Sequence, residues 1–228
     1  MPNIYAHSGD GFAGSAVDSS WVFVRRSSGA TSDNNNTRDQ TAVLVFLDEG
    51  KGGGLAFDIR RTFMSFDTSG ISVAPSEATL KVRGYSSGTS DVIVVKSTAA
   101  DTVVNGSFDD LPSTSAAISN TDGSGAGTLA GIAGLTYSAE ISTWSTSGYN
   151  DIELNSTALS DMASLDTFKI CIMNYDFDYL DIAPSSATLA RIGLYWTDYT
   201  GTSRDPYIDL TEGVAAAEDN SVFFGANF

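Results

Sequence analysis

Apolar and polar residues alternate in short runs along most of this chain, with the two-residue period of a β-strand whose faces meet different surroundings. Turn-forming glycine, serine and asparagine residues separate these runs, so the pattern predicts many short strands joined by loops. The predicted strands span residues 20–25, 42–47, 62–67, 78–85, 91–96, 135–141, 168–173, 187–197 and 206–211.

One phrase occurs twice, as VAPSEATL at residues 73–80 and as IAPSSATL at residues 182–189. In each copy a Pro-Ser turn ends one segment, and the alternating stretch after it starts a strand. The residues expected to face inward from these two strands are Leu80, Val82, Ile192, Leu194 and Trp196. A structural device that is used twice favours a sandwich of two sheets.

Other segments depart from simple alternation. Residues 42–47 are apolar throughout, which predicts a strand that is covered on both faces. We expect the chain itself to cover one face, and either the chain or another subunit to cover the other. Asn155 is a suitable N-cap for a short helix over residues 156–163. The predicted loops span residues 27–39, 49–54 and 113–134.

Length and pattern together predict the fold class. A chain of 228 residues is long enough for one large β-domain that buries about 70% of its unfolded surface. We expect an all-β fold, a single jelly-roll-like two-sheet antiparallel β-sandwich over residues 1–212 with one short helix. We expect residues 213–228 to form an arm that either docks on a neighbouring protein or folds back on its own sandwich, through Val222, Phe223, Phe224 and Phe228.

The chain is strongly acidic, with 28 Asp and Glu against 12 Lys and Arg and a net charge of −16. This charge repels phosphate groups and anionic lipids, so neither nucleic acid nor a membrane is an expected partner. The chain shows neither a secretory signal pattern nor an apolar run long enough to span a bilayer. The acidity is typical of a soluble protein whose copies repel one another.

Matches to catalytic motifs are weak. Residues 84–88 fit G-x-S-x-G, but a strand is predicted to follow, and the one histidine, His7, lies upstream, so a hydrolase triad is not expected. The glycine-rich residues 50–54 and 125–130 lack the spacing or the strand–helix context of nucleotide-binding loops. The single cysteine, Cys171, lies in an apolar alternating run and is predicted to be a core thiol.

Acidic side chains are concentrated in NYDFDYLD, residues 174–181. If the segment is extended, Asn174, Asp176 and Asp178 lie on one face. With Asp181 and loop carbonyls they are candidates for the six to eight oxygen ligands of Ca²⁺, although the spacing is not that of an EF-hand. The alternative is a solvated acidic face that pairs with arginine. Calcium is therefore the candidate cofactor, and the predicted fold requires none.

Aromatic residues near predicted strand ends are candidates for ligand contact. Their rings can stack on sugars or fill a protein interface, and many rings at such positions belong simply to the core. The candidate ligand-binding residues are Trp144, Tyr149, Tyr179 and Tyr199. Glycoside hydrolysis requires a pair of carboxyl groups, and the sequence contains many Asp residues but no spacing that identifies such a pair.

Three stretches resemble a known family. Residues 60–67 (RRTFMSFD), followed by ATL at residues 78–80, are similar to the R-x-F-x-x-F-D…A-T-L core of DNRLRE-type jelly-roll modules, relatives of carbohydrate-binding modules. Residues 198–209 (DYTGTSRDPYID) resemble the final strand of such modules in structural proteins of tailed bacteriophages, and residues 149–159 are also similar. The resemblance implies a jelly-roll sandwich used for attachment.

These observations predict a non-enzymatic structural protein of a bacteriophage virion, either a capsid-decoration or a fibre-like surface protein. Its expected location is the virion, assembled in the host cytoplasm, and its expected partners are capsid or other virion proteins and further copies of itself. The first alternative is a carbohydrate-binding module that attaches to surface glycans, either with or without a requirement for calcium. The second is a polysaccharide-cleaving enzyme, which requires two carboxyl groups about 5–10 Å apart in a cleft.

Overall fold

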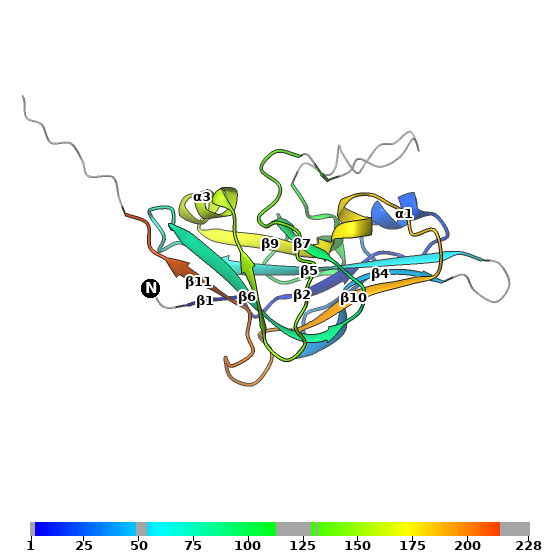
Figure 1. Ribbon diagram of the computed structural model, residues 1–228, viewed down its shortest axis with the longest axis horizontal. Helices are drawn as coiled ribbons and strands as arrows, with labels where there is room; N and C mark the ends of the chain where they lie inside the picture. The colour runs from blue at the N-terminus through cyan, green and yellow to red at the C-terminus, as the bar shows by residue number, and fades with distance from the viewer. Residues whose placement is uncertain (1–2, 49–53, 113–128, 131, 215–228) are drawn as a thin grey trace, which may run out of the picture.

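The computed structural model describes residues 3–48, 54–112, 129–130 and 132–214, and these are mostly β-structure (Figure 1). Within these ranges eleven strands pair in antiparallel fashion, and the helices are short. The predicted strand-rich class is confirmed. None of the described helices has the length and apolar character needed to cross a bilayer.

Strands make up most of the described elements, and the helical elements are short. The strands are β1 (Ile4–Tyr5), β2 (Gly11–Gly14), β3 (Thr31–Asp33), β4 (Arg38–Asp48), β5 (Ala56–Asp67), β6 (Glu77–Ser87), β7 (Val92–Lys96), β8 (Tyr149–Glu153), β9 (Thr167–Asn174), β10 (Thr188–Tyr195) and β11 (Tyr207–Thr211). The helical elements are α1 (Trp21–Arg25), the 3₁₀ turn η1 (Asn105–Asp109), α3 (Ser156–Ser164) and the π-helical turn η2 (Tyr175–Tyr179).

Two long strands hold the sheet together. β5 pairs with β4 through residues 56–60, with β2 through residues 60–63 and with β9 through residues 62–67. β6 pairs with β8 and β11 through its first part and with β10 through its last residues. The sequence predicted two separate sheets, and these are not observed. The described strands join in one sheet of order β1-β11-β6-β10-β4-β5-β2-β3, from which β7, β8 and β9 branch.

The duplicated phrase marks the starts of β6 and β10, as predicted, and these two strands are neighbours in the sheet. The inward-facing assignment is also confirmed, because Leu80, Val82, Ile192, Leu194 and Trp196 are all fully buried in one apolar cluster. The two copies differ at their last position. Leu80 is buried, whereas its counterpart Leu189 is 48% exposed.

Two apolar clusters form the core. The first collects side chains of β6, β8, β10 and β11 together with side chains of β5, β7, β9 and α3. The second contains side chains from α1, η1 and the other faces of β4, β5, β7 and β9. Ala42 and Val43 belong to the first cluster and Val45 and Leu47 to the second, so the chain itself covers both faces of this apolar strand. Cys171 is buried in the second cluster, as predicted.

The strand predicted over residues 20–25 is wrong, because these residues form the short helix α1. Trp21 and Val24, three positions apart, are buried in the second cluster, while Phe23 is 71% exposed. The indole of Trp21 also packs edge-on against Phe57 of β5 at 5.6 Å. Tertiary packing at helical spacing therefore overrides the strand preference of the two valines.

Other boundaries also differ. The strand predicted over residues 135–141 is reduced to isolated bridges from Thr136 to Val95 and from Ile141 to Val92. The loop predicted over residues 27–39 contains β3 and the start of β4, and β1, β2 and β8 were not predicted. These strands are two to five residues long, too short for alternation to stand out.

The predicted helix is confirmed as α3, which lies beside β9 (Figure 1). The side-chain oxygen of Asn155 accepts hydrogen bonds from the amides of Thr157 at 3.0 Å and Ala158 at 3.1 Å, which is N-cap geometry. Ala158 and Met162 are buried in the first cluster, and Leu159 packs partly against it.

Candidate functional site

The segment predicted to be an extended acidic strand, residues 174–181, is largely a turn. η2 follows β9 directly, so the two-residue period ends at Asn174. The side-chain oxygen of Asn174 accepts hydrogen bonds from the amides of Phe177 at 2.8 Å and Asp178 at 3.4 Å. Asn174 therefore caps this turn, and its oxygen is directed at backbone donors.

Asp178 is fully buried, and its carboxylate binds two arginines. Arg61 donates from Nε to Oδ2 and from Nη2 to Oδ1, both at 2.7 Å. Arg25 donates from Nε to Oδ1 at 3.3 Å and from Nη2 to the Asp178 backbone oxygen at 2.6 Å. Burial alone would raise the pKa of Asp178, but Arg61 and Arg25 together hold it below its ordinary value.

Asp181 completes this buried ionic network. Its Oδ1 lies 2.6 Å from Nη1 of Arg25 and accepts a hydrogen bond from the indole nitrogen of Trp21 at 3.0 Å. The network joins α1, β5 and η2, and it occupies the oxygens of two of the four predicted metal ligands. The structure does not bring Asn174, Asp176, Asp178 and Asp181 together around one point.

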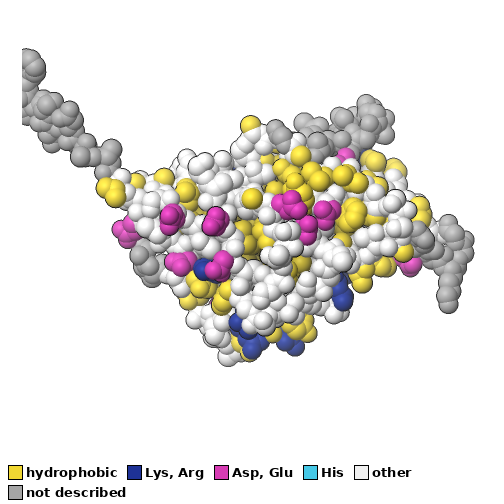
Figure 2. Space-filling model, in the orientation of Figure 1, with side chains coloured by type: hydrophobic (Ala, Val, Ile, Leu, Met, Phe, Trp, Pro, Cys, Tyr) yellow, Lys and Arg dark blue, Asp and Glu magenta, His cyan; other side chains and the backbone are white. Residues whose placement is uncertain are grey.

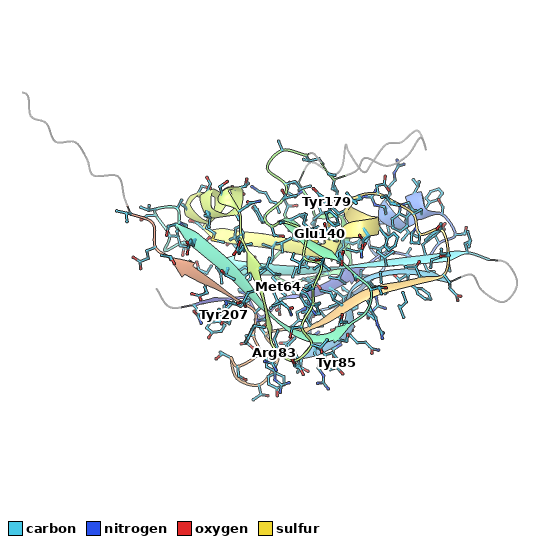
Figure 3. The ribbon with its side chains drawn as sticks, in the orientation of Figure 1. Met64, Arg83, Tyr85, Glu140, Tyr179 and Tyr207 are labelled. Carbon is cyan, nitrogen blue, oxygen red and sulfur yellow. The ribbon has the colours of Figure 1, made fainter. Side chains whose placement is uncertain are left out.

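A different set of carboxylates does converge. Asp91 precedes β7, Glu140 lies in the loop after Tyr137, and Asp176 lies in η2; one oxygen from each lies within 4.8 Å of the others. Backbone hydrogen bonds hold these segments together, because the amide of Tyr175 donates to the Asp91 carbonyl at 2.8 Å. Figure 3 labels Glu140, and Figure 2 shows acidic side chains grouped in the same region. We call Asp91, Glu140 and Asp176 the acidic triad.

The acidic triad is electrostatically strained. Desolvation, and then a hydrogen bond to Asp91 and the charges of Asp91 and Asp176, raise the pKa of Glu140. Burial and the charge of Asp91 raise the pKa of Asp176. Either a shared proton or a hard cation such as Ca²⁺, which prefers carboxylate oxygens, would relieve this repulsion. Of the predicted metal ligands, only Asp176 belongs to the triad.

A second group lies on the outer face of β6 and its neighbours, where arginine and tyrosine side chains alternate in space. Figure 3 labels three of its members, and Figure 2 shows the Lys and Arg side chains gathered along the lower edge of the molecule. We call this group the Tyr–Arg patch, and its residues are Tyr5, Arg38, Arg83, Tyr85, Tyr149, Tyr195, Tyr199, Arg204 and Tyr207.

One half of the Tyr–Arg patch is centred on Tyr195 of β10. Its hydroxyl oxygen accepts hydrogen bonds from Nη1 of Arg38 at 3.0 Å and from Nη1 of Arg204 at 2.6 Å. The Arg38 guanidinium lies 4.2 Å from the ring centre of Tyr85, and that of Arg204 lies 4.4 Å from the ring centre of Tyr199. Cation–π contacts and hydrogen bonds therefore fix both guanidinium groups in place.

The other half of the patch surrounds Tyr149 of β8. Its ring packs edge-on against Tyr207 at 5.3 Å and lies 6.0 Å from the guanidinium carbon of Arg83, its partner on β6. The hydroxyl of Tyr149 donates to the carbonyl of Asp205 at 3.2 Å. Burial, followed by the neighbouring Tyr207 and Asp205, raises the pKa of Tyr149 to about 12, so this hydroxyl keeps its proton.

The four predicted ligand-binding aromatics separate into two groups. Tyr149 and Tyr199 belong to the Tyr–Arg patch. Trp144 packs partly against the first core cluster and donates its indole N–H to the Gly193 carbonyl at 3.2 Å. Tyr179 is buried in the second cluster, where it stacks on Tyr175 at 5.5 Å. The predicted interface residues Val222, Phe223, Phe224 and Phe228 lie outside the described residues.

Sequence reasoning missed most residues of both groups. Asp91 and Glu140 are separated by about fifty positions, and nothing in their local pattern distinguishes them from other surface acids. For the Tyr–Arg patch a usable signal existed, because basic residues are scarce and Arg83 lies two positions from Tyr85 on a predicted strand. The adjacent arginines of the chain, Arg25-Arg26 and Arg60-Arg61, each give one residue to the buried ionic network.

Comparison with models of protein families and with curated protein sequences finds no match to this chain.

Proposed function

We propose that this protein is a non-enzymatic structural component of a bacteriophage virion, a capsid-decoration or fibre-like protein on the particle surface. The observation that carries the proposal is an end of the molecule rich in exposed apolar side chains, which fits a contact with a neighbouring virion subunit. The resemblance of residues 60–67 and 198–209 to jelly-roll modules of tailed phages supports the same function.

The fold is compatible with the jelly-roll part of this proposal. The first core cluster collects buried side chains of β6, β8 and β11 together with those of β5, β7 and β9. Such a shared core is what a sandwich requires. In this proposal the long strands β5 and β6 pass from one layer to the next, which accounts for a single connected sheet.

Strand pairing brings the residues of the apolar end together. Phe57 pairs with Leu47 and forms a bridge to Asp18, and Leu47 in turn pairs with Thr188. Exposed apolar residues lie next to this row of paired residues on several segments. They are Val17 (64% exposed), Leu55 (47%) and Leu189 (48%).

Two further residues extend the apolar end. Phe23 of α1 is the most exposed aromatic side chain of the described residues, and Ile182 is 53% exposed. The hydrogen bond from Trp21 to Asp181 holds α1 beside the segment that carries Ile182. A large exposed phenylalanine among aliphatic side chains is typical of a protein contact and is unfavourable in water.

Charge supports a partner other than a free copy in solution. At a net charge of −16, two copies repel each other over distances of about a Debye length, near 8 Å at physiological salt. Association through an apolar end therefore requires a partner that offsets this charge or a lattice that holds many copies in place. A virion surface supplies both conditions.

The G-x-S-x-G match has the structure of a strand within the sheet. Ser86, of the G-x-S-x-G match, lies in strand β6 and donates its hydroxyl to the Gln40 carbonyl at 2.8 Å. The strand-to-helix turn of a nucleophile elbow is therefore not formed there.

The test is whether purified particles of the encoding phage contain the chain, measured by mass spectrometry and sedimentation. We expect several copies per particle that co-sediment with it. The double variant Phe23→Ser/Leu189→Ser should fold, since both side chains are exposed, and should bind particles at least about tenfold less tightly. The exposed pair Val104→Ser/Leu165→Ser is the matched control. Particles that lack the chain would disprove the proposal.

A further inference from the structure

The Tyr–Arg patch contains cationic groups that lack carboxylate partners. The chain has 28 acidic residues, and most of its lysines pair with one of them. Among the described residues, by contrast, Arg38, Arg83, Arg191 and Arg204 appear in no ion pair, and three of these four lie in the patch. We propose that this patch is a binding site for an anionic polysaccharide whose sugars carry carboxylate groups. This goes beyond a structural function on a particle.

The arrangement around Tyr195 favours an anionic ligand. Arg38 and Arg204 donate to the same hydroxyl oxygen, at 3.0 and 2.6 Å, so two like charges are held close together. A neutral phenol cannot neutralise them, and each guanidinium has further N–H groups that point elsewhere. A carboxylate that accepts from both guanidiniums would relieve the repulsion and form charge-assisted hydrogen bonds.

The tyrosines favour a sugar as the carrier of that carboxylate. Tyr5 is 39% exposed, and Tyr85, Tyr149, Tyr199 and Tyr207 are partly exposed. Tyrosine rings offer apolar faces for the C–H surface of a pyranose, and their hydroxyls offer hydrogen bonds to sugar hydroxyls. Mutual ring contacts hold these side chains in place before binding, which lowers the entropic cost of association.

The shape of the patch favours a polymer over a globular partner. Its members come from β1, β4, β6, β8, β10, β11 and the connection between β10 and β11, which carries Tyr199 and Arg204. The patch follows the outer face of β6 from Tyr207 to Tyr85 (Figure 3). An elongated row of rings and guanidiniums suits a ligand that repeats the same sugar.

The binding test uses polygalacturonate as the probe, with neutral dextran as the uncharged comparison, by isothermal titration calorimetry at two salt concentrations. We expect the full chain to bind polygalacturonate, to bind more weakly at the higher salt concentration, and to ignore dextran. The variant Arg38→Gln/Arg204→Gln should bind about tenfold less tightly or worse, because it loses charge-assisted contacts. Tyr195→Phe keeps the ring but removes the shared oxygen, and it should also weaken binding.

Arg191→Gln is the matched control, since Arg191 also lacks a carboxylate partner in the described chain but lies outside the patch. It should leave the affinity unchanged, and an equal loss there would mean that net charge alone is measured. Equal affinity for dextran, no affinity for either polymer, or equal affinity for dextran sulfate would overturn the proposal. Equal affinity for poly-glutamate would also overturn it and would identify an acidic polypeptide as the ligand.

Discussion

Replacing Asp178 with asparagine tests the buried ionic network most directly. The substitution keeps the size of the side chain but removes the charge that faces Arg61 and Arg25, whose side chains are 0% and 1% exposed. Breaking a buried ion pair by removing one partner typically costs about 3–5 kcal/mol, because the remaining charge is left uncompensated. Arg61 loses the carboxylate that it binds, whereas Arg25 keeps Asp181 at 2.6 Å, so we expect a loss near the middle of that range.

The loss is measurable by urea unfolding, followed by tryptophan fluorescence and circular dichroism. For a protein of this size, about 4 kcal/mol corresponds to a fall in the melting temperature on the order of 10 °C. The matched control is Asp151→Asn, which breaks the 2.7 Å pair with Lys81, in which the Asp151 side chain is 60% exposed. That exposed pair contributes about 1 kcal/mol or less.

The pH dependence supplies an independent measurement. Because the pKa of Asp178 is lower in the folded than in the unfolded protein, its contribution to stability is present above the unfolded value, near 4. That contribution is lost as the pH falls through the folded pKa, and Asp178→Asn should therefore flatten the acid limb of the stability curve. If the free energy of unfolding of Asp178→Asn lies within about 1 kcal/mol of the wild-type value, the buried network does not stabilise the fold as argued.

Three further predictions concern other sites. Burial raises the pKa of Asp10 to about 7, although hydrogen bonds from Thr197 oppose the shift. The folded protein therefore favours the protonated carboxyl group. The free energy of unfolding should decline as the pH rises from about 4 through 7. Asp10→Asn should remove that decline, by about 4 kcal/mol at most, in urea titrations at pH 5 and pH 8. Calcium should raise the melting temperature of the wild type but not that of Glu140→Gln; equal shifts would mean that Ca²⁺ binds elsewhere. Gly84→Ala should destabilise by about 1–3 kcal/mol, because the new Cβ would lie 1.8 Å from the Ser145 carbonyl oxygen, while Gly70→Ala, which meets no atom within 4 Å, should have little effect on urea unfolding.

Strand β6 was predictable because its alternation is unambiguous, and its buried positions include Leu80 and Val82. In β10, Ile192 and Leu194 are buried as expected, although Gly193 between them is buried as well. The helix α1 was not predictable in this way, because WVFVR has the composition of a strand and only the packing of Trp21 decides its conformation. Local pattern determined the regular elements, and long-range contacts determined the exceptions.

The candidate sites were less accessible to sequence reasoning. For the acidic segment 174–181 the sequence left two interpretations open, a metal site or a solvated face that pairs with arginine. The structure pairs Asp178 and Asp181 with Arg25 and Arg61, which lie about 120 to 160 positions earlier. A single sequence without contacts shows which residues are charged, but it does not show which opposite charge each one meets.

The pairing of the strands has a consequence for how the chain folds. Ile4 of β1 lies opposite Ile208 of β11, about two hundred positions later, and β11 lies next to β6. Folding rates fall as the mean sequence separation of contacts increases, so this topology predicts slow folding, in milliseconds to seconds or longer. During synthesis, the β6 edge that β11 occupies stays open until residue 211 has left the ribosome. Unpaired strand edges promote aggregation, so the yield of folded protein should depend on chain concentration and on chaperones.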